Sequence, residues 1–154
     1  MTEQRRLAAI VSADVAGYSR LMGRDESGTL AALKAIRREV VDPKITQHRG
    51  RIVKTTGDGL LLEFASAVEA VRCVVEVQTA MTMHNADIPQ ETRIQFRIGV
   101  NIGDVIVEDE DIFGDGVNVA ARLEQLAQPG EILVSRSIFE QVQDKLALEH
   151  EGLN

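Results

Sequence analysis

Two aspartates at predicted strand ends are the residues of this sequence best suited to hold a metal ion. Asp14 ends the apolar stretch LAAIVSAD, and Asp58 occupies the turn of IVKTTGDGLLLEF. Hard oxygen ligands with open coordination positions suit Mg²⁺ or Mn²⁺, which keep waters and bind substrate phosphates. However, Asp-Gly between apolar runs is also a strong hairpin signal. On spacing alone, a strand-end aspartate and a turn aspartate remain the simpler interpretation.

A second set of polar residues could bind an anion. The segment GDGVNVAARLEQL predicts a helix with an apolar stripe of Val119, Leu123 and Leu126. Asn118 and Arg122 are four residues apart on an adjacent flank, so their side chains point the same way. The guanidinium could clamp a phosphate, because it offers five donors in a fixed fork. The alternative is a solvated polar pair on the helix surface.

Arg97 and Lys54 extend the candidate site to two predicted strands. In RIQFRIGVNI, apolar residues alternate with polar ones, which predicts a strand with one face on a core. Arg97 lies on the polar face, which we expect a ligand or another subunit to cover. Lys54 places an ammonium group four residues before Asp58. A zinc site is not predicted, because the histidines cluster neither with one another nor with the cysteine: His48, His84, His150 and Cys73.

The elements that must position these residues follow in the order β, α, β-β, α, β-β, α, β, α. The pattern predicts strands over residues 7–15, 51–57, 60–65 and 93–102, and helices from residues 26, 66, 117 and 136. Gly103-Asp104 is expected to turn the chain into a separate strand, VIVED. Hairpins between helices predict an α+β fold, a largely antiparallel sheet with helices packed on one face. No repeat or linker interrupts the chain, so we expect one domain over residues 1–154.

Bulk properties exclude several classes of protein. The 154 residues carry a net charge of −7, which argues against general nucleic-acid binding. No apolar run approaches the roughly 20 residues of a membrane span, and the N-terminal stretch lacks the apolar region of a signal peptide. Cys73 is the only cysteine, which indicates a reducing, cytoplasmic setting and a buried helix position rather than a reactive thiol.

Taken together, these motifs resemble the catalytic domain of the class III nucleotidyl cyclases, the adenylate and guanylate cyclase family, with its palm-type, ferredoxin-like sheet. VSADVAGYSRLM resembles the first-strand metal motif, and IVKTTGDGLLLEF the hairpin with a second metal aspartate. FRIGVNIGDV resembles the next strand, and DIFGDGVNVAARLE the helix motif. The four motifs occur in the family's order and cover about Arg6 to Ser135.

The resemblance implies the role of each residue. Asp14 and Asp58 would hold two Mg²⁺ or Mn²⁺ ions, with the backbone carbonyl of Val15 as a further ligand. Lys54 and Asp111 stand where adenylate cyclases read adenine and guanylate cyclases have other residues, so the implied substrate is ATP. Asn118 would orient the ribose, Arg122 would stabilise the transition state, and Arg97 would bind phosphate oxygens. Asp115 falls on a position without a catalytic role, where we expect a turn or helix-start residue.

The resemblance also implies a head-to-tail homodimer with active sites at its interface. One protomer would supply Asp14, Asp58 and Arg97, and its partner would supply Lys54, Asp111, Asn118 and Arg122. The family domain continues into a further hairpin with a phosphate-binding lysine, whereas this sequence ends at LALEHEGLN. We therefore expect weaker dimerisation, weaker pyrophosphate binding and low activity, and flanking regions of a longer protein could attach to a membrane.

Three alternatives to adenylate cyclase remain at this stage. Guanylate cyclase shares the family motifs. A cyclase-like domain could bind nucleotide or dimerise without turnover, although such domains typically lose a metal aspartate or the arginine. A diguanylate cyclase would also use metal carboxylates on a palm-like sheet, but its GGDEF-type signature is absent from the sequence.

Overall fold

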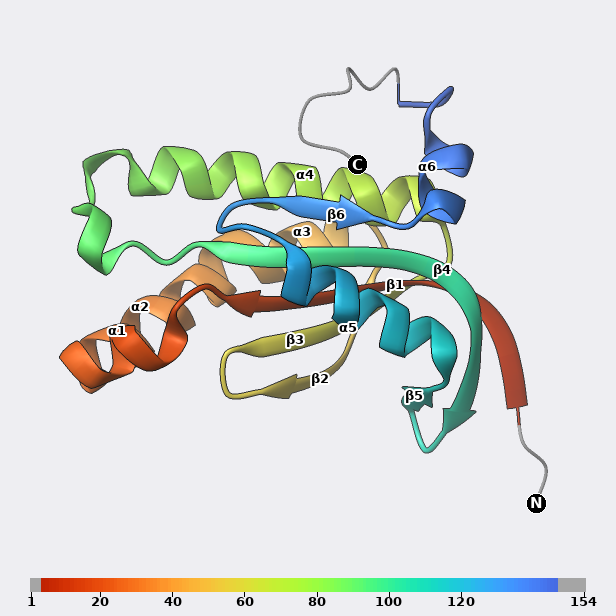
Figure 1. The fold of residues 1–154 in the computed structure, drawn as a ribbon, viewed down its shortest axis with the longest axis horizontal. Helices are drawn as coiled ribbons and strands as arrows, with labels where there is room; N and C mark the ends of the chain where they lie inside the picture. Colours follow the sequence, from red (N-terminus) through yellow and green to blue (C-terminus); the bar gives the residue numbers. More distant parts are fainter. Residues whose placement is uncertain (1–3, 147–154) are drawn as a thin grey trace.

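A central sheet built on two long antiparallel strands organises the molecule (Figure 1). The computed structural model describes residues 4–146. Strand β1 (Gln4–Val15) pairs with β4 (Phe96–Glu108) from Gln4 opposite Val107 to Val15 opposite Phe96. The remaining strands are β2 (Arg51–Thr56), β3 (Gly59–Phe64), β5 (Asp111–Phe113) and β6 (Ile132–Val134). The strand order across the sheet is β2-β3-β1-β4-β5, and β6 pairs with β4 in parallel. The predicted α+β fold with a largely antiparallel sheet is confirmed.

Helices α2, α4 and α6 begin at residues whose side chains satisfy free backbone N–H groups. The side chains of Asp25, Ser66 and Ser135 accept hydrogen bonds from the backbone three residues later. The α-helices are α1 (Tyr18–Arg24), α2 (Glu26–Ile36), α3 (Asp42–Gln47), α4 (Ala67–His84), α5 (Asp115–Leu126) and α6 (Arg136–Val142). A π-helical turn η1 (Arg37–Val41) joins α2 to α3, and 3₁₀ turns η2 (Asn85–Asp87) and η3 (Gln90–Thr92) follow α4. Within residues 4–146, none of these helices combines the length and the apolar character needed to cross a bilayer.

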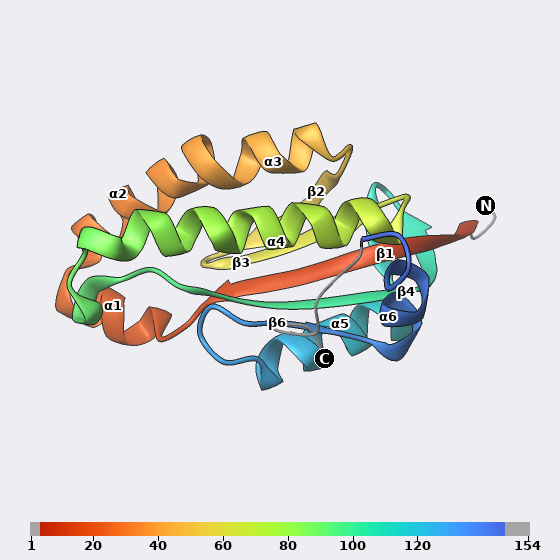
Figure 2. The same ribbon diagram turned by 90° about the horizontal axis from the view of Figure 1, so that it is seen from above.

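The main core lies on the side of the sheet that α4 covers, which we call the α4 face. Figure 2 shows α4 running along the β1–β4 pair, beside the segment formed by α2 and α3. Every second residue of the two long strands points into this core: Ala9, Val11, Ala13 and Val15 from β1, and Phe96, Ile98 and Val100 from β4. The predicted alternation is therefore confirmed within β4, although the strand begins at Phe96 and not at residue 93.

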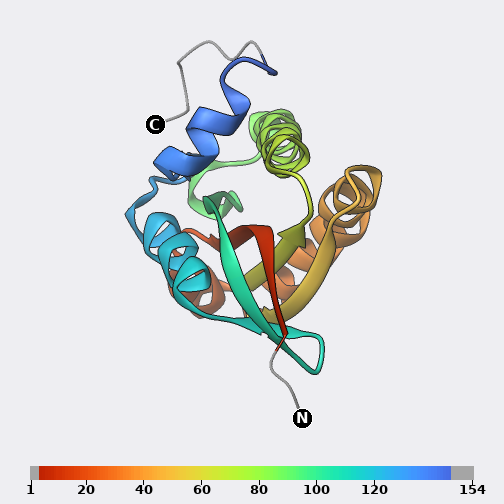
Figure 3. The same ribbon diagram turned by 90° about the vertical axis from the view of Figure 1, so that its right-hand side faces the viewer.

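Helix α5 crosses the opposite side of the sheet, the α5 face, whereas the sequence placed all helices on one face (Figure 3). Close contact is possible because Gly99 has no side chain: a Cβ atom there would lie 2.3 Å from the carbonyl oxygen of Ala120. The buried residues of α5 are Gly116, Ala120 and Glu124. The polar face of β4 is thus covered in part by the chain's own helix.

Two details of the sequence interpretation were wrong. The predicted apolar stripe of α5 is not its buried face: Leu126 is 70% exposed and Val119 and Leu123 are only half-buried, because Gly116 and Ala120 allow closer packing on the sheet. Gly103-Asp104 does not end a strand, because β1 extends far enough to pair with both residues, and β4 continues to Glu108. The chain reverses instead at Asp109 and Glu110, both with positive φ.

Candidate active site

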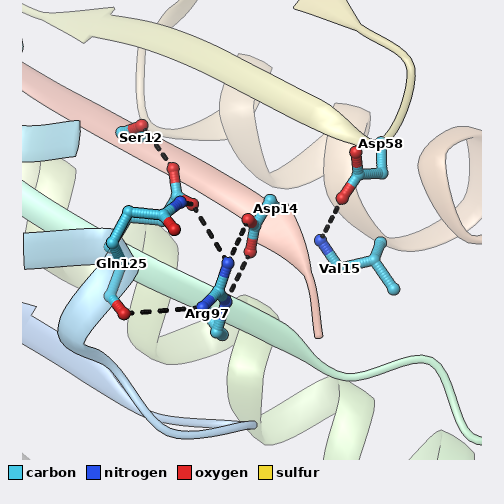
Figure 4. Close-up of polar contacts among 7 residues, drawn as sticks. Ser12, Asp14, Val15, Asp58, Arg97 and Gln125 are labelled. Atoms are coloured by element: carbon cyan, nitrogen blue, oxygen red, sulfur yellow. Dashed lines mark hydrogen bonds and ion pairs between the residues drawn. The ribbon is translucent and has the colours of Figure 1, made fainter. Parts of the chain in front are cut away.

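Asp58 reaches the end of β1 from the tip of the β2–β3 hairpin. Gly57 adopts a left-handed conformation with φ of 51°, which glycine accepts without strain, so the predicted hairpin turn is confirmed. The Asp58 carboxylate accepts a hydrogen bond of 3.0 Å from the backbone N–H of Val15 (Figure 4). The hairpin therefore brings Asp58 to the residue that follows Asp14.

Asp14 is held by an arginine from the neighbouring strand. Arg97 lies directly opposite Asp14 in the β1–β4 ladder and binds both carboxylate oxygens, with Nε at 2.8 Å and Nη2 at 2.5 Å (Figure 4). Burial raises the pKa of Asp14, but the hydrogen bonds and positive charge of Arg97, together with contributions from Glu124 and Gln125, outweigh burial and lower the pKa of Asp14. Asp14 is consequently an ionised carboxylate whose two oxygens already have a cationic partner.

Glu124 is a site residue that the sequence interpretation missed. Its side chain is 8% exposed, and it accepts hydrogen bonds from Ser12 Oγ at 2.8 Å and Gln125 Nε2 at 2.6 Å. Arg97 Nη2 lies 3.6 Å from its Oε2 atom. Burial and the neighbouring Asp14 raise the pKa of Glu124 to about 7. The spacing of Gly116, Ala120 and Glu124, four residues apart, was the signal that could have placed this carboxylate on the inner face of the helix.

These residues border an open cleft of about 330 Å³ on the α5 face. Its lining includes Asp14, Asp58, Lys54 and Glu124. Lys54 Nζ lies 3.2 Å from Asp111 Oδ2 and 5.6 Å from the centre of the Phe113 ring. The structure thus pairs Asp111 with Lys54, which lines the cleft that contains both candidate metal ligands.

Asn118 and Arg122 lie elsewhere on α5. Both are exposed, and neither lines this cleft. Neither side chain forms a hydrogen bond or ion pair with another residue between 4 and 146, and the backbone N–H of Asn118 donates to the carbonyl oxygen of Gly114 within the helix start. Within one chain, therefore, the structure does not bring Asn118 or Arg122 to Asp14. Asp115 is exposed in the first turn of α5, as expected for a helix-start residue.

The donor set of the cleft fits a hard cation only in part. Asp14 and Asp58 offer carboxylate oxygens, which Mg²⁺ and Mn²⁺ prefer. No group of three or more His, Cys, Asp or Glu residues in the described part of the chain is placed to hold a metal ion. Two carboxylates would therefore need substrate or water oxygens, and the backbone carbonyl of Val15 could add one more.

The remaining candidates for chemistry lie away from the cleft. His48 is buried and contacts Glu69 at 2.7 Å and Glu76 at 3.2 Å. Cys73 is buried in α4, as predicted, and burial raises the pKa of its thiol to about 12. His84 ends α4, and His150 lies outside the described residues.

The fold that carries these residues, a curled and largely antiparallel sheet with helices packed on it, is shared with a known class of domain. Residues 2–152 match the family described as the adenylate and guanylate cyclase catalytic domain. A putative adenylate cyclase 3 of Rhizobium meliloti (strain 1021) is 52% identical over 146 residues, covering 95% of this chain and 25% of that protein.

Two solved structures are also similar. A crystal structure named adenylate/guanylate cyclase/hydrolase from Silicibacter pomeroyi has a TM-score of 0.88 and 54% identity, covering 94% of this chain and 84% of that one. The guanylyl cyclase Cya2 has a TM-score of 0.78 and 28% identity, covering 92% and 80%. This chain belongs to the adenylate and guanylate cyclase catalytic domain family. It spans about a quarter of the length of the Rhizobium meliloti relative.

Proposed function

We propose that this chain is an adenylate cyclase domain that converts ATP into 3′,5′-cyclic AMP and pyrophosphate. The observation that carries the choice of ATP is the pairing of Lys54 with Asp111 at 3.2 Å. A lysine ammonium donates hydrogen bonds and a carboxylate accepts them. This pair therefore suits adenine, which offers ring-nitrogen acceptors and an amino donor.

In the proposed reaction, the ribose 3′-oxygen forms a bond to the α-phosphorus while the bond from that phosphorus to the β-phosphate oxygen breaks. Pyrophosphate leaves, and the hydroxyl proton passes to solvent. Divalent ions held by Asp14 and Asp58 would lower the pKa of the attacking hydroxyl and stabilise the attacking and leaving oxygens. Arg97, which lies beside Asp14, would bind phosphate oxygens, and positioning and charge stabilisation would do most of the work.

We propose that a second copy of the chain completes each site. Asn118, Arg122 and Leu126 are four residues apart on one exposed face of α5, and Leu126 is 70% exposed. An exposed leucine beside an unpaired guanidinium is expected at a surface that meets a partner. In a head-to-tail homodimer, Asn118 would orient the ribose and Arg122 would stabilise the transition-state phosphate of the partner's site, together with Lys54 and Asp111.

The nearest competing functions are guanylate cyclase and a domain that binds nucleotide without turnover. Guanine presents a carbonyl oxygen where adenine has its amino group, so Asp111 would face an acceptor and repel it. A non-catalytic domain would not need Asp14, Asp58 and Arg97 to converge. The ion pairs in the described structure therefore support an ATP-using enzyme.

Separate incubations of the purified chain with ATP and GTP in the presence of Mn²⁺ test the proposal. Cyclic AMP and pyrophosphate in equal amounts are expected from ATP, with much less cyclic GMP from GTP. Asp58→Asn should abolish the product and leave the melting temperature close to that of the wild type. Preferential formation of cyclic GMP would overturn the choice of base. Nucleotide binding without any cyclic product, in a sample shown to be dimeric, would favour the non-catalytic alternative.

A further inference from the structure

Arg97 lies between two carboxylates, and this arrangement raises a conflict with metal binding. Its guanidinium donates to Asp14 Oδ1 at 2.8 Å and Oδ2 at 2.5 Å. A divalent ion that binds Asp14 needs one or both of those oxygens. The conflict follows from the proposed role of Asp14 as a metal ligand. A carboxylate oxygen can accept a hydrogen bond and bind a metal at once, but two cations at the same oxygens repel each other, so Arg97 and the ion compete for Asp14.

The second carboxylate offers Arg97 an alternative partner. Glu124 Oε2 lies 3.6 Å from Arg97 Nη2, longer than a hydrogen bond but within reach after a small side-chain movement. The Arg97 side chain is 24% exposed, and both of its carboxylate neighbours, Asp14 and Glu124, line the open cleft. A second acceptor nearby reduces the cost of releasing Asp14, because the guanidinium does not lose every charged partner at once.

The immediate surroundings of Glu124 fit this role. A buried carboxylate is costly unless charged or hydrogen-bonding partners compensate it. Ser12 and Gln125 supply neutral donors that fix the carboxylate. Among the residues of the described chain, Arg97 is the cation found in ion-pair range of Glu124. Two hydrogen bonds therefore hold the Glu124 carboxylate in place, and Arg97 is the cation near enough to bind it.

We propose that Glu124 is a positioning residue that holds Arg97 when a divalent ion takes Asp14. In the metal-free protein, Arg97 binds both oxygens of Asp14 and lies within 3.6 Å of Glu124. When the ion binds, Arg97 moves fully to Glu124 and stays at the cleft, where its remaining N–H groups face the phosphates. Glu124 thus acts through Arg97 and does not touch substrate.

The movement of Arg97 can be followed by NMR without nucleotide and without turnover. In protein labelled with ¹⁵N-arginine, the Arg97 Nε–H signal, assigned with Arg97→Gln, is recorded during titration with Mg²⁺. In the wild type, we expect the signal to shift at the midpoint of Mg²⁺ binding and to stay protected from exchange with water. In Glu124→Gln, the signal should lose that protection at saturating Mg²⁺. A signal that stays unchanged while Mg²⁺ binds at Asp14 would overturn the proposal.

Metal affinity measured by calorimetry gives an independent readout. Glu124→Gln should weaken Mn²⁺ binding by roughly 10-fold, the lower end of losses for residues that support metal ligands. In the Arg97→Gln background the same substitution should change affinity much less, because no guanidinium needs a second partner. A carboxylate that acts only through its charge would weaken binding equally in both backgrounds, which would contradict the proposal.

One control separates this inference from the proposed function. Asp14→Asn should abolish Mn²⁺ binding if Asp14 is a ligand. If Asp14→Asn leaves binding intact, the assignment of the metal site fails, and with it the premise of the conflict. If Asp14→Asn abolishes binding while Glu124→Gln changes neither affinity nor Arg97 protection, only the role of Glu124 fails. Glutamine has the shape of glutamate and can accept from Ser12, so the fold is expected to survive.

Discussion

The contact between Gly99 and α5 predicts that adding one methyl group will destabilise the protein. A Cβ atom at position 99 would lie 2.3 Å from the carbonyl oxygen of Ala120 and 2.5 Å from the backbone N of Glu124. Both atoms belong to the helix backbone and cannot rotate away, so α5 must shift. Overpacking of this kind costs about 1–3 kcal/mol. For a chain of this size, each kcal/mol lowers the melting temperature by about 2–4 °C.

The assay is thermal and urea unfolding of Gly99→Ala beside a matched control, Gly23→Ala. A Cβ atom at Gly23, inside α1, meets nothing within 4 Å, so alanine there should stabilise the protein by about 0.5–1 kcal/mol through its better helix propensity. Gly99→Ala should lower the melting temperature by about 2–12 °C. A melting temperature for Gly99→Ala equal to or above that of the wild type would refute the proposed packing of α5.

Three further predictions concern charge. Arg122→Ala should lower kcat on the order of 10²–10³ without changing the melting temperature, whereas Arg136→Ala, 90% exposed on α6, should change neither. Burial opposes protonation of His48, but hydrogen bonds to Glu69 and Glu76 outweigh it and raise its pKa above the usual 6.5. The difference in unfolding free energy between the wild type and His48→Gln should therefore be largest below pH 6.5 and should decline as the pH rises through the pKa of His48 in the folded protein. A difference that stays constant with pH would contradict this. Hydrogen bonds from Arg6, with a smaller contribution from Arg51, lower the pKa of Glu63 below its usual 4.5. In urea unfolding near pH 7, Glu63→Gln should therefore reduce the free energy of unfolding by about 1–2 kcal/mol. The reduction should become smaller as the pH falls below 4.5, because the glutamate then becomes protonated.

The sequence predicted the parts of the site that depend on local pattern. The Asp58 hairpin followed from Asp-Gly between apolar runs, and the strand around Arg97 followed from strict alternation. Alternation also placed Arg97 on the polar face, opposite the main core. Such features depend on neighbours in the chain and on the period of the side chains, and both can be read without a structure.

What the sequence did not predict depends on contacts between distant segments. Glu124 was missed because a glutamate near the end of a helix is usually exposed, and only the close approach permitted by Gly99 buries it. The same approach put Leu126 on the outside. The continuous strand through Gly103 depends on how far β1 extends, which the local sequence does not reveal.

The central claim, an ATP site built from two copies of the chain, is tested most directly by mixing two inactive variants. Asp58→Asn removes a ligand on one side of the proposed site, and Arg122→Ala removes the guanidinium on the other. In a mixture whose heterodimers are verified by cross-linking of differently tagged chains, one site in each heterodimer would be intact. We expect cyclic AMP formation to return to about a quarter of the wild-type rate, because about half of the dimers are mixed and each has one working site. Mixed dimers that remain as inactive as the separate variants would contradict the account.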